Sequence, residues 1–219
     1  MKTLQKSGGL AALYMAVAHL IGILIFLVVL DYLNITDPAQ KLALNVEKQS
    51  VIFSTNLLMY VFFGVALIIL SLALYDRMKA GAPALMQVAA AIGMIWAGSL
   101  IASGMAANAG LSTVVALYAK DPAQAVLTFQ AIESITNGLG NANGEILGGT
   151  WTLLVSLAAL RMCGLPKGLN ILGVFVGVVG ILTIIPALTD FTGVFGLGQI
   201  IWFVGLGIVL LHSYPAKEA

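Results

Sequence analysis

Six long apolar stretches follow one another along the chain, separated by segments that hold most of its charged residues. The stretches cover residues 9–31, 51–75, 84–107, 142–160, 170–188 and 196–212. Each reaches or approaches the ~20 residues that a helix needs to cross ~30 Å of hydrocarbon. The pattern predicts one all-α integral membrane domain over residues 1–219, a six-transmembrane-helix bundle.

Two of the segments between the stretches repeat the tetrapeptide Asp-Pro-Ala-Gln, at residues 37–40 and 121–124. Asp accepts a hydrogen bond from a free backbone N–H at a helix start, and Pro at the first helical position needs no N–H partner. Both tetrapeptides therefore predict short helical extensions on the extracytoplasmic side. No Gly or Pro stands between Pro38 and Gly64, which favours one unbroken helix from Pro38 into the second stretch.

The few charges predict how the chain lies in the membrane. Charged residues are 9% of the sequence and hydrophobic residues 60%, with a net charge of +1. The short connections 76–83 and 161–167 contain Arg77, Lys79, Arg161 and Lys167, and short cytoplasmic loops are rich in Lys and Arg. We expect a multi-pass protein of a bacterial inner membrane, with both termini in the cytoplasm, lipid as its surroundings and no nucleic-acid partner.

Polar side chains fall at comparable depth near the outer ends of several predicted spans. They are Asn56, Asn108, Asn143, Glu145, Asp190 and Gln199. An unpaired polar group there would cost about 1–3 kcal/mol, so these groups should bond one another, water or a ligand. The cluster predicts a ligand-binding pocket that faces the extracytoplasmic side. The alternative is that these residues only mark the membrane interface, where polar groups cost little.

His19 lies near the middle of the first predicted span, where an ionisable side chain usually faces the bundle interior. It is a further candidate for ligand contact, proton relay or metal binding. The interpretation we favour is structural, a neutral imidazole bonded to a neighbouring helix. His212 lies at the far end of the last span, too distant to share a haem iron with His19. With Cys163 the only cysteine, we expect no metal and no cofactor.

Glycines form small faces on two predicted spans. Gly144-x-x-x-Gly148 is followed by Gly149, and Gly173-x-x-x-Gly177 is followed by Gly180. Small residues let helix backbones approach closely where lipid offers no hydrophobic drive to associate. The pattern predicts a compact bundle, and it is compatible with homo- or hetero-oligomers through the glycine faces.

No known catalytic motif stands in the sequence. The leading hypothesis is a non-enzymatic membrane protein that binds or passes a small or lipid-like ligand in the outer polar pocket. The alternative is a structural or accessory subunit of a larger membrane complex. A lipid-modifying enzyme with Glu145 as general base is a third, less favoured hypothesis.

The C-terminal part of the chain resembles a known family. The resemblance is carried by Leu165-Pro166-Lys167-Gly168-Leu169, by the segment from Gly177 to Pro186, and by Phe195-Gly-Leu-Gly-Gln199-Ile-Ile-Trp202. These segments are similar to a bacterial family of multi-pass membrane proteins, the domain of unknown function 4386 family. The resemblance implies a six-helix bacterial inner-membrane protein, and it supplies no activity, substrate or catalytic residue.

Overall fold

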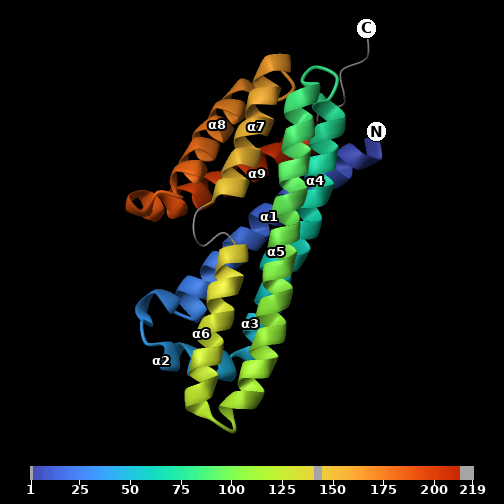
Figure 1. Ribbon diagram of the computed structural model, residues 1–219. Helices are drawn as coiled ribbons and strands as arrows, with labels where there is room; N and C mark the ends of the chain where they lie inside the picture. The colour runs from blue at the N-terminus through green and yellow to red at the C-terminus, as the bar shows by residue number, and fades with distance from the viewer. Residues whose placement is uncertain (1, 141–144, 213–219) are drawn as a thin grey trace. The chain divides into compact units, whose positions relative to one another are not determined.

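The computed structural model describes residues 2–140 and 145–212, which form helices joined by short turns, with no strand among them (Figure 1). Four helical segments in these ranges are long and apolar enough to cross a membrane: Thr3–Val29, Gln49–Met78, Pro83–Tyr118 and Pro186–His212. Two shorter apolar helices are Ile146–Met162 and Lys167–Leu182. The all-α class is confirmed, and the four long apolar helices mark the chain as a membrane protein.

The chain divides into two compact units. Unit 1 contains Met1–Val17, Gly64–Gly98 and Asn143–Ala219, and unit 2 contains Ala18–Phe63 and Ser99–Ala142. Helices α1 (Lys2–Leu24) and α5 (Pro83–Tyr118) contribute residues to both units.

Unit 1 is built mainly from α7 (Ile146–Met162), α8 (Lys167–Leu182), α9 (Thr192–His212) and most of α4 (Phe63–Met78). Helices α7 and α8 lie side by side (Figure 1). Their backbones touch, because a Cβ added to Gly149 would lie 2.8 Å from the carbonyl oxygen of Gly177, and one added to Gly177 equally close to that of Gly149. The glycine faces therefore allow close helix packing inside the chain, as predicted.

Aromatic rings fill the centre of unit 1. The Trp151 ring centroid lies 5.8 Å from that of Trp96 and 5.6 Å from that of Trp202. Trp151, Trp202 and Phe203 are completely buried. These tryptophans are core residues whose edge-to-face and tilted contacts stabilise the unit.

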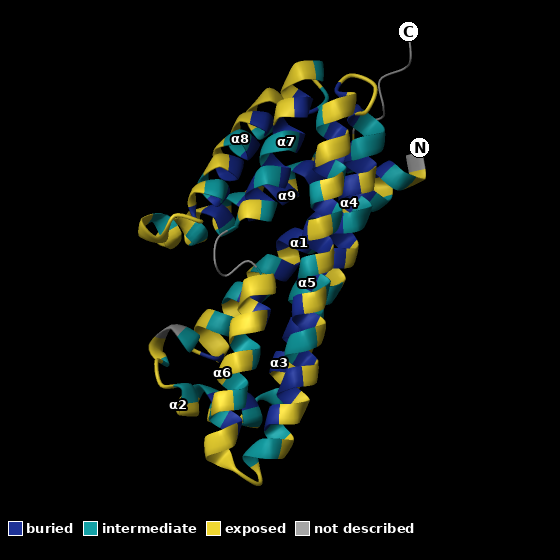
Figure 2. Cartoon of the chain, viewed as in Figure 1, coloured by how far each residue is buried: buried dark blue, intermediate teal, exposed yellow. Residues whose placement is uncertain are grey.

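Helix α8 has two unlike faces. Figure 2 shows both buried and exposed positions along α8. Its glycine side is buried, while the large apolar side chains of Ile171 and Phe175 are each 55% exposed. An exposed row of large apolar side chains on a helix is expected where the solvent is lipid. The helix ends at Leu182, before Pro186 opens the 3-10 turn η4 (Pro186–Phe191), so it is shorter than the predicted stretch 170–188.

Unit 2 contains the last part of α1 and the second part of α5, joined by shorter elements. These are the π-helical turn η1 (Ile25–Val29), the 3-10 turn η2 (Tyr32–Asn34), α2 (Pro38–Glu47), α3 (Gln49–Asn56), the π-helical turn η3 (Leu57–Phe62) and α6 (Pro122–Leu139). Leu42, Val114 and Ala125 form one buried cluster between α2, α5 and α6. Leu30, Ile52 and Leu111 form a second. The two clusters hold α2, α3 and α6 against α5.

The two Asp-Pro sequences begin helices, as predicted. The Asp37 carboxylate accepts a hydrogen bond from the Ala39 N–H at 3.1 Å, and Asp121 accepts one from the Gln124 N–H at 3.0 Å. Pro38 and Pro122 follow as first helical residues. The helical extensions α2 and α6 are therefore fixed by local chemistry.

The expectation of one unbroken helix from Pro38 into the second stretch is wrong. Helix α2 ends at Glu47 and α3 begins at Gln49, with Lys48 between them at φ −99° and ψ 24°. No glycine or proline causes the break. Tertiary packing does, because α2 lies against α6 through the fully buried Leu42, and packing of this kind overrides local helix propensity.

Candidate functional site

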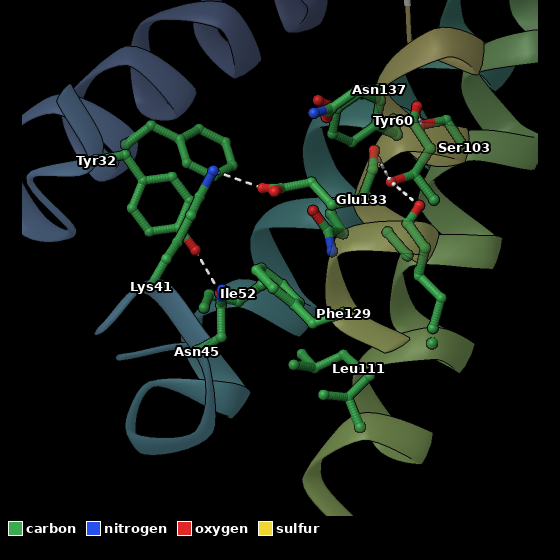
Figure 3. Close-up of a pocket in the computed structure, with 17 residues that line it drawn as sticks. Tyr32, Lys41, Asn45, Ile52, Tyr60, Ser103, Leu111, Phe129, Glu133 and Asn137 are labelled. Carbon is green, nitrogen blue, oxygen red and sulfur yellow. Dashed lines mark hydrogen bonds and ion pairs between the residues drawn. The ribbon is translucent and has the colours of Figure 1, made fainter. Parts of the chain in front are cut away.

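Unit 2 holds a cavity of about 260 Å³ lined by residues of η1, η2, α2, α3, η3, α5 and α6 (Figure 3). A second hollow, of about 410 Å³, lies against α3 and has only Ser and Thr hydroxyls as polar side chains in its lining. The first cavity also contains charged and amide groups. It is therefore the stronger candidate for a binding site.

An ion pair borders the cavity. The ammonium nitrogen of Lys41 on α2 lies 2.5 Å from a carboxylate oxygen of Glu133 on α6, and the two side chains are 24% and 28% exposed. The same nitrogen lies 4.9 Å from the centroid of the Tyr32 ring. Figure 3 shows the Lys41 side chain reaching from α2 toward Glu133, beside the Tyr32 ring. A cation at this distance from an aromatic face is attracted by the ring quadrupole.

The position of Tyr32 is fixed by a hydrogen bond of its side chain and by the backbone conformation of the preceding residue. Its hydroxyl donates a hydrogen bond to the side-chain oxygen of Asn45, which is buried. The preceding residue, Asp31, has a φ of 50°, a left-handed conformation that Asp tolerates better than most residues. Burial raises the pKa of Tyr32 to about 12, although the Asn45 hydrogen bond lowers it. The phenol therefore stays neutral at physiological pH.

Buried amides form part of the cavity wall. Asn56 lines the cavity, and its side-chain nitrogen donates a hydrogen bond to the side-chain oxygen of Asn108 at 2.9 Å. Asn108 in turn donates to the carbonyl oxygen of Phe53 at 3.2 Å. The pair connects α3 with α5 through a hydrogen bond between the two amide side chains.

Two lining hydroxyls also donate within the protein. The Ser103 hydroxyl donates to the carbonyl oxygen of Thr136 at 2.8 Å, and the Thr136 hydroxyl donates to that of Ile132 at 3.0 Å. A hydroxyl has one hydrogen and two lone pairs. Because the hydrogens of Ser103 and Thr136 are already used, their oxygens are left to act as acceptors.

Apolar side chains complete the lining. Ile52, Leu111, Phe129 and Ile132 contribute to it (Figure 3). The cavity is therefore amphipathic, with an ion pair, acceptor oxygens and a hydrocarbon wall. This combination suits a ligand that has both a polar head and an apolar part.

Both π-helical turns contribute a lining residue. Phe26 lies in η1 and Tyr60 in η3, which directly follows Asn56. Single π-helical turns inside α-helices are rare and occur frequently at functional sites. Of the two, η3 lies inside one helical segment between α3 and α4, whereas η1 lies at the end of the segment that α1 begins, so it is η3 that supports the cavity as the functional site.

The structure places the predicted site residues in both units. Asn56 lines the cavity, and Asn108 supports it. Gln199, in unit 1, is fully buried and donates to the Thr152 hydroxyl oxygen at 3.0 Å. Its role there is to join α7 and α9.

The remaining predicted residues have separate surroundings. Glu145 precedes α7 in unit 1, and its backbone N–H donates to the Thr183 hydroxyl oxygen at 2.9 Å. Asp190 is exposed on η4, and Asn143 lies outside the described residues. His19, in unit 2, packs edge-on against the Phe63 ring, with centroids 5.0 Å apart.

Tyr32, Lys41 and Glu133 line the cavity but are not among the site residues predicted from the sequence. They stand in two connections between the predicted spans, where charged and aromatic residues suggest a solvated surface. One signal was available, because Phe129, Ile132, Glu133 and Thr136 follow the i, i+3, i+4, i+7 spacing of a single helix face. A carboxylate within the apolar stripe of an amphipathic helix indicates a buried partner.

No group of three or more His, Cys, Asp and Glu side chains in residues 2–140 and 145–212 is arranged to hold a metal ion. No protein family, curated protein or solved structure matches the chain. The family resemblance of the C-terminal part therefore stays a prediction. The fold and the site define an all-helical membrane protein with an amphipathic cavity.

Proposed function

We propose that this chain is a non-enzymatic membrane protein that binds or passes a small or lipid-like ligand through the cavity of unit 2. The observation that carries the proposal is the amphipathic lining around about 260 Å³. Ligand pockets commonly have ~300–1,000 Å³. A cavity slightly smaller than that range accommodates the head of an amphiphile and the start of its chain, rather than a whole lipid.

The proposal includes six spans in a bacterial inner membrane, with both termini in the cytoplasm. Arg77 and Lys79 stand just before α5, and Arg161 and Lys167 stand at the short connection between α7 and α8, which supports a cytoplasmic position for these turns. Membership of the family with domain of unknown function 4386 belongs to the same proposal.

The length of α5 supports an outward-facing cavity. The helix has 36 residues, about 54 Å at 1.5 Å per residue, whereas the hydrocarbon core is ~30 Å thick. With Pro83 at the cytoplasmic boundary, the lining residue Ser103 stands about 30 Å along the axis, near the outer boundary. The rest of α5 then projects outward with α6.

Chemical analysis of the purified full chain tests the proposal. Ala107 lines the cavity and Ala109 is exposed on the same helix, so Ala107→Phe fills the cavity and Ala109→Phe is the matched control. Each protein is purified in maltoside micelles, incubated with bacterial polar lipid extract, and analysed by native mass spectrometry and solvent extraction. We expect about one bound amphiphile per chain in the wild type and in Ala109→Phe, and none in Ala107→Phe.

Equal amounts of bound lipid in all three proteins, or none in any, would overturn the cavity proposal. A second protein that co-purifies at fixed stoichiometry, with no bound amphiphile, would favour the accessory-subunit alternative instead.

Reporter fusions test the orientation. A periplasmic phosphatase fused after Gln124, at the start of α6, should be active, and one fused after Lys79 should be inactive. The reverse pattern would overturn the topology without affecting the cavity.

A further inference from the structure

The ammonium group of Lys41 occupies a site that is built by other elements. The carboxylate comes from Glu133 on α6 and the ring from Tyr32 on η2, while Lys41 itself comes from α2. A carboxylate oxygen at 2.5 Å and an aromatic centroid at 4.9 Å are the two kinds of partner that an ammonium ion takes. The position of Lys41 therefore shows what these two groups can hold.

Three hydroxyls of the surrounding lining offer acceptors, beside amide side chains that can both donate and accept. The hydroxyl hydrogens of Tyr32, Ser103 and Thr136 all point to oxygens within the protein. Their lone pairs, and the Glu133 carboxylate, suit a ligand that donates hydrogen bonds. An anionic head would meet these same lone pairs, with Lys41 as the only cationic side chain in the lining described.

We infer that the cavity takes an amphiphilic amine whose ammonium group replaces that of Lys41 between Glu133 and Tyr32. The alkyl part of the ligand then lies against Leu111 and Phe129, which line the same cavity. This inference rests on the proposed function, because it names the ligand of that cavity. Lys41 is able to leave, since a long and strongly hydrated side chain can turn its ammonium to water.

If the ligand displaces Lys41, substitution of Lys41 and substitution of Glu133 should have opposite effects on the affinity for the ligand. An amine ligand must compete with Lys41 for Glu133, so removal of Lys41 should strengthen binding and removal of Glu133 should weaken it. An anionic ligand would compete with Glu133 for Lys41, and both signs would be reversed. The signs of the two effects therefore decide which charge the ligand carries.

The experiment measures equilibrium binding of three labelled probes to the full chain in maltoside micelles: dodecylammonium, dodecyl phosphate and dodecanol. The variants are Lys41→Met and Glu133→Gln. Their matched controls are Lys120→Met and Glu47→Gln, which make the same charge changes at exposed positions. Lys41→Gln replaces Lys41→Met if the latter does not fold, as judged by thermal unfolding.

We expect wild-type protein to bind dodecylammonium in preference to dodecyl phosphate. Its dissociation constant should fall about three- to tenfold in Lys41→Met and rise about tenfold in Glu133→Gln, with both controls unchanged. Tyr32→Leu should weaken binding about two- to fivefold, the range of an exposed cation–π contact.

The possible failures are distinguishable. Preferred binding of dodecyl phosphate, lost in Lys41→Met, would overturn the amine assignment and leave the cavity proposal standing. Preferred binding of dodecanol, with the same affinity in Lys41→Met and Glu133→Gln, would also overturn the amine assignment and leave the cavity proposal standing. If no probe binds, or if Ala107→Phe binds all three as the wild type does, both the amine assignment and the proposed function fail.

Discussion

Replacement of Gly149 by alanine tests how closely α7 and α8 pack. A Cβ atom at Gly149 would lie 2.7 Å from the backbone nitrogen of Ile181 and 2.8 Å from the carbonyl oxygen of Gly177. Both are backbone atoms, so no side-chain rotation relieves the contact. Atoms in favourable contact are ~3.5–4.0 Å apart, and the helices would have to separate by about 1 Å.

Gly98→Ala on α5 is a matched control from which the loss of stability in Gly149→Ala can be estimated. A Cβ atom at Gly98 meets no described atom within 4 Å, so Gly98→Ala changes helix propensity without overpacking. Alanine is favoured over glycine in a helix by ~0.5–1 kcal/mol, and overpacking costs ~1–3 kcal/mol. Because the propensity gain is common to both variants, Gly149→Ala should have a free energy of unfolding about 1–3 kcal/mol below that of Gly98→Ala.

Denaturant unfolding in micelles, followed by tryptophan fluorescence, measures this difference. Trp96, Trp151 and Trp202 are all buried in unit 1, and Trp151 lies on the same helix as Gly149, so their combined emission reports on separation of α7 from its neighbours. Equal stability of the two variants would refute the conclusion that backbone contact joins α7 and α8.

Three further predictions concern unit 2. Asp37→Ala and Asp121→Ala each remove a helix cap, and each should lower the free energy of unfolding by about 1 kcal/mol in a denaturant titration. Asn108→Leu removes the acceptor of the buried Asn56 amide and should lower the free energy of unfolding by about 1–3 kcal/mol. A double-mutant cycle with Asn56→Leu should show that the two effects are coupled, and strictly additive effects would contradict the hydrogen bond. Ultraviolet titration should show a tyrosine with a pKa of about 12 that is missing in Tyr32→Phe. In the folded protein the pKa of Tyr32 is raised above the ordinary 10.0, so the neutral phenol stabilises the folded state. This contribution to the free energy of unfolding is complete below pH 10.0 and is lost as the pH rises through about 12.

Helices α2 and α6 show how much of the fold the local sequence determines. Asp37 and Asp121 begin their helices through contacts with residues two and three positions along the chain, so the sequence is sufficient to predict α2 and α6. The break at Lys48 could not be predicted in this way, because its cause is the packing of Leu42 against residues of α5 and α6.

The candidate site depends still more on long-range contacts. Asn56 and Asn108 could be proposed as partners because both stand near the outer ends of predicted spans, and the structure joins them by a hydrogen bond. Gln199, placed at comparable depth by the same argument, bonds through its side chain to Thr152 in unit 1, and Glu145 in the same unit donates its backbone N–H to the Thr183 hydroxyl oxygen. Depth in a span restricts the possible partners of a side chain, but the direction of each helix face selects among them.

The sequence by itself determined that the chain is helical and suited to a membrane, since the length and polarity of a stretch decide whether a helix is stable in hydrocarbon. It also determined the helix starts at Asp-Pro and the glycine faces of α7 and α8. Only the tertiary structure decided that Tyr32, Lys41 and Glu133 meet around one cavity. These residues stand on three separate elements, and their contact depends on how α2 packs against α6, a long-range arrangement that no local pattern encodes.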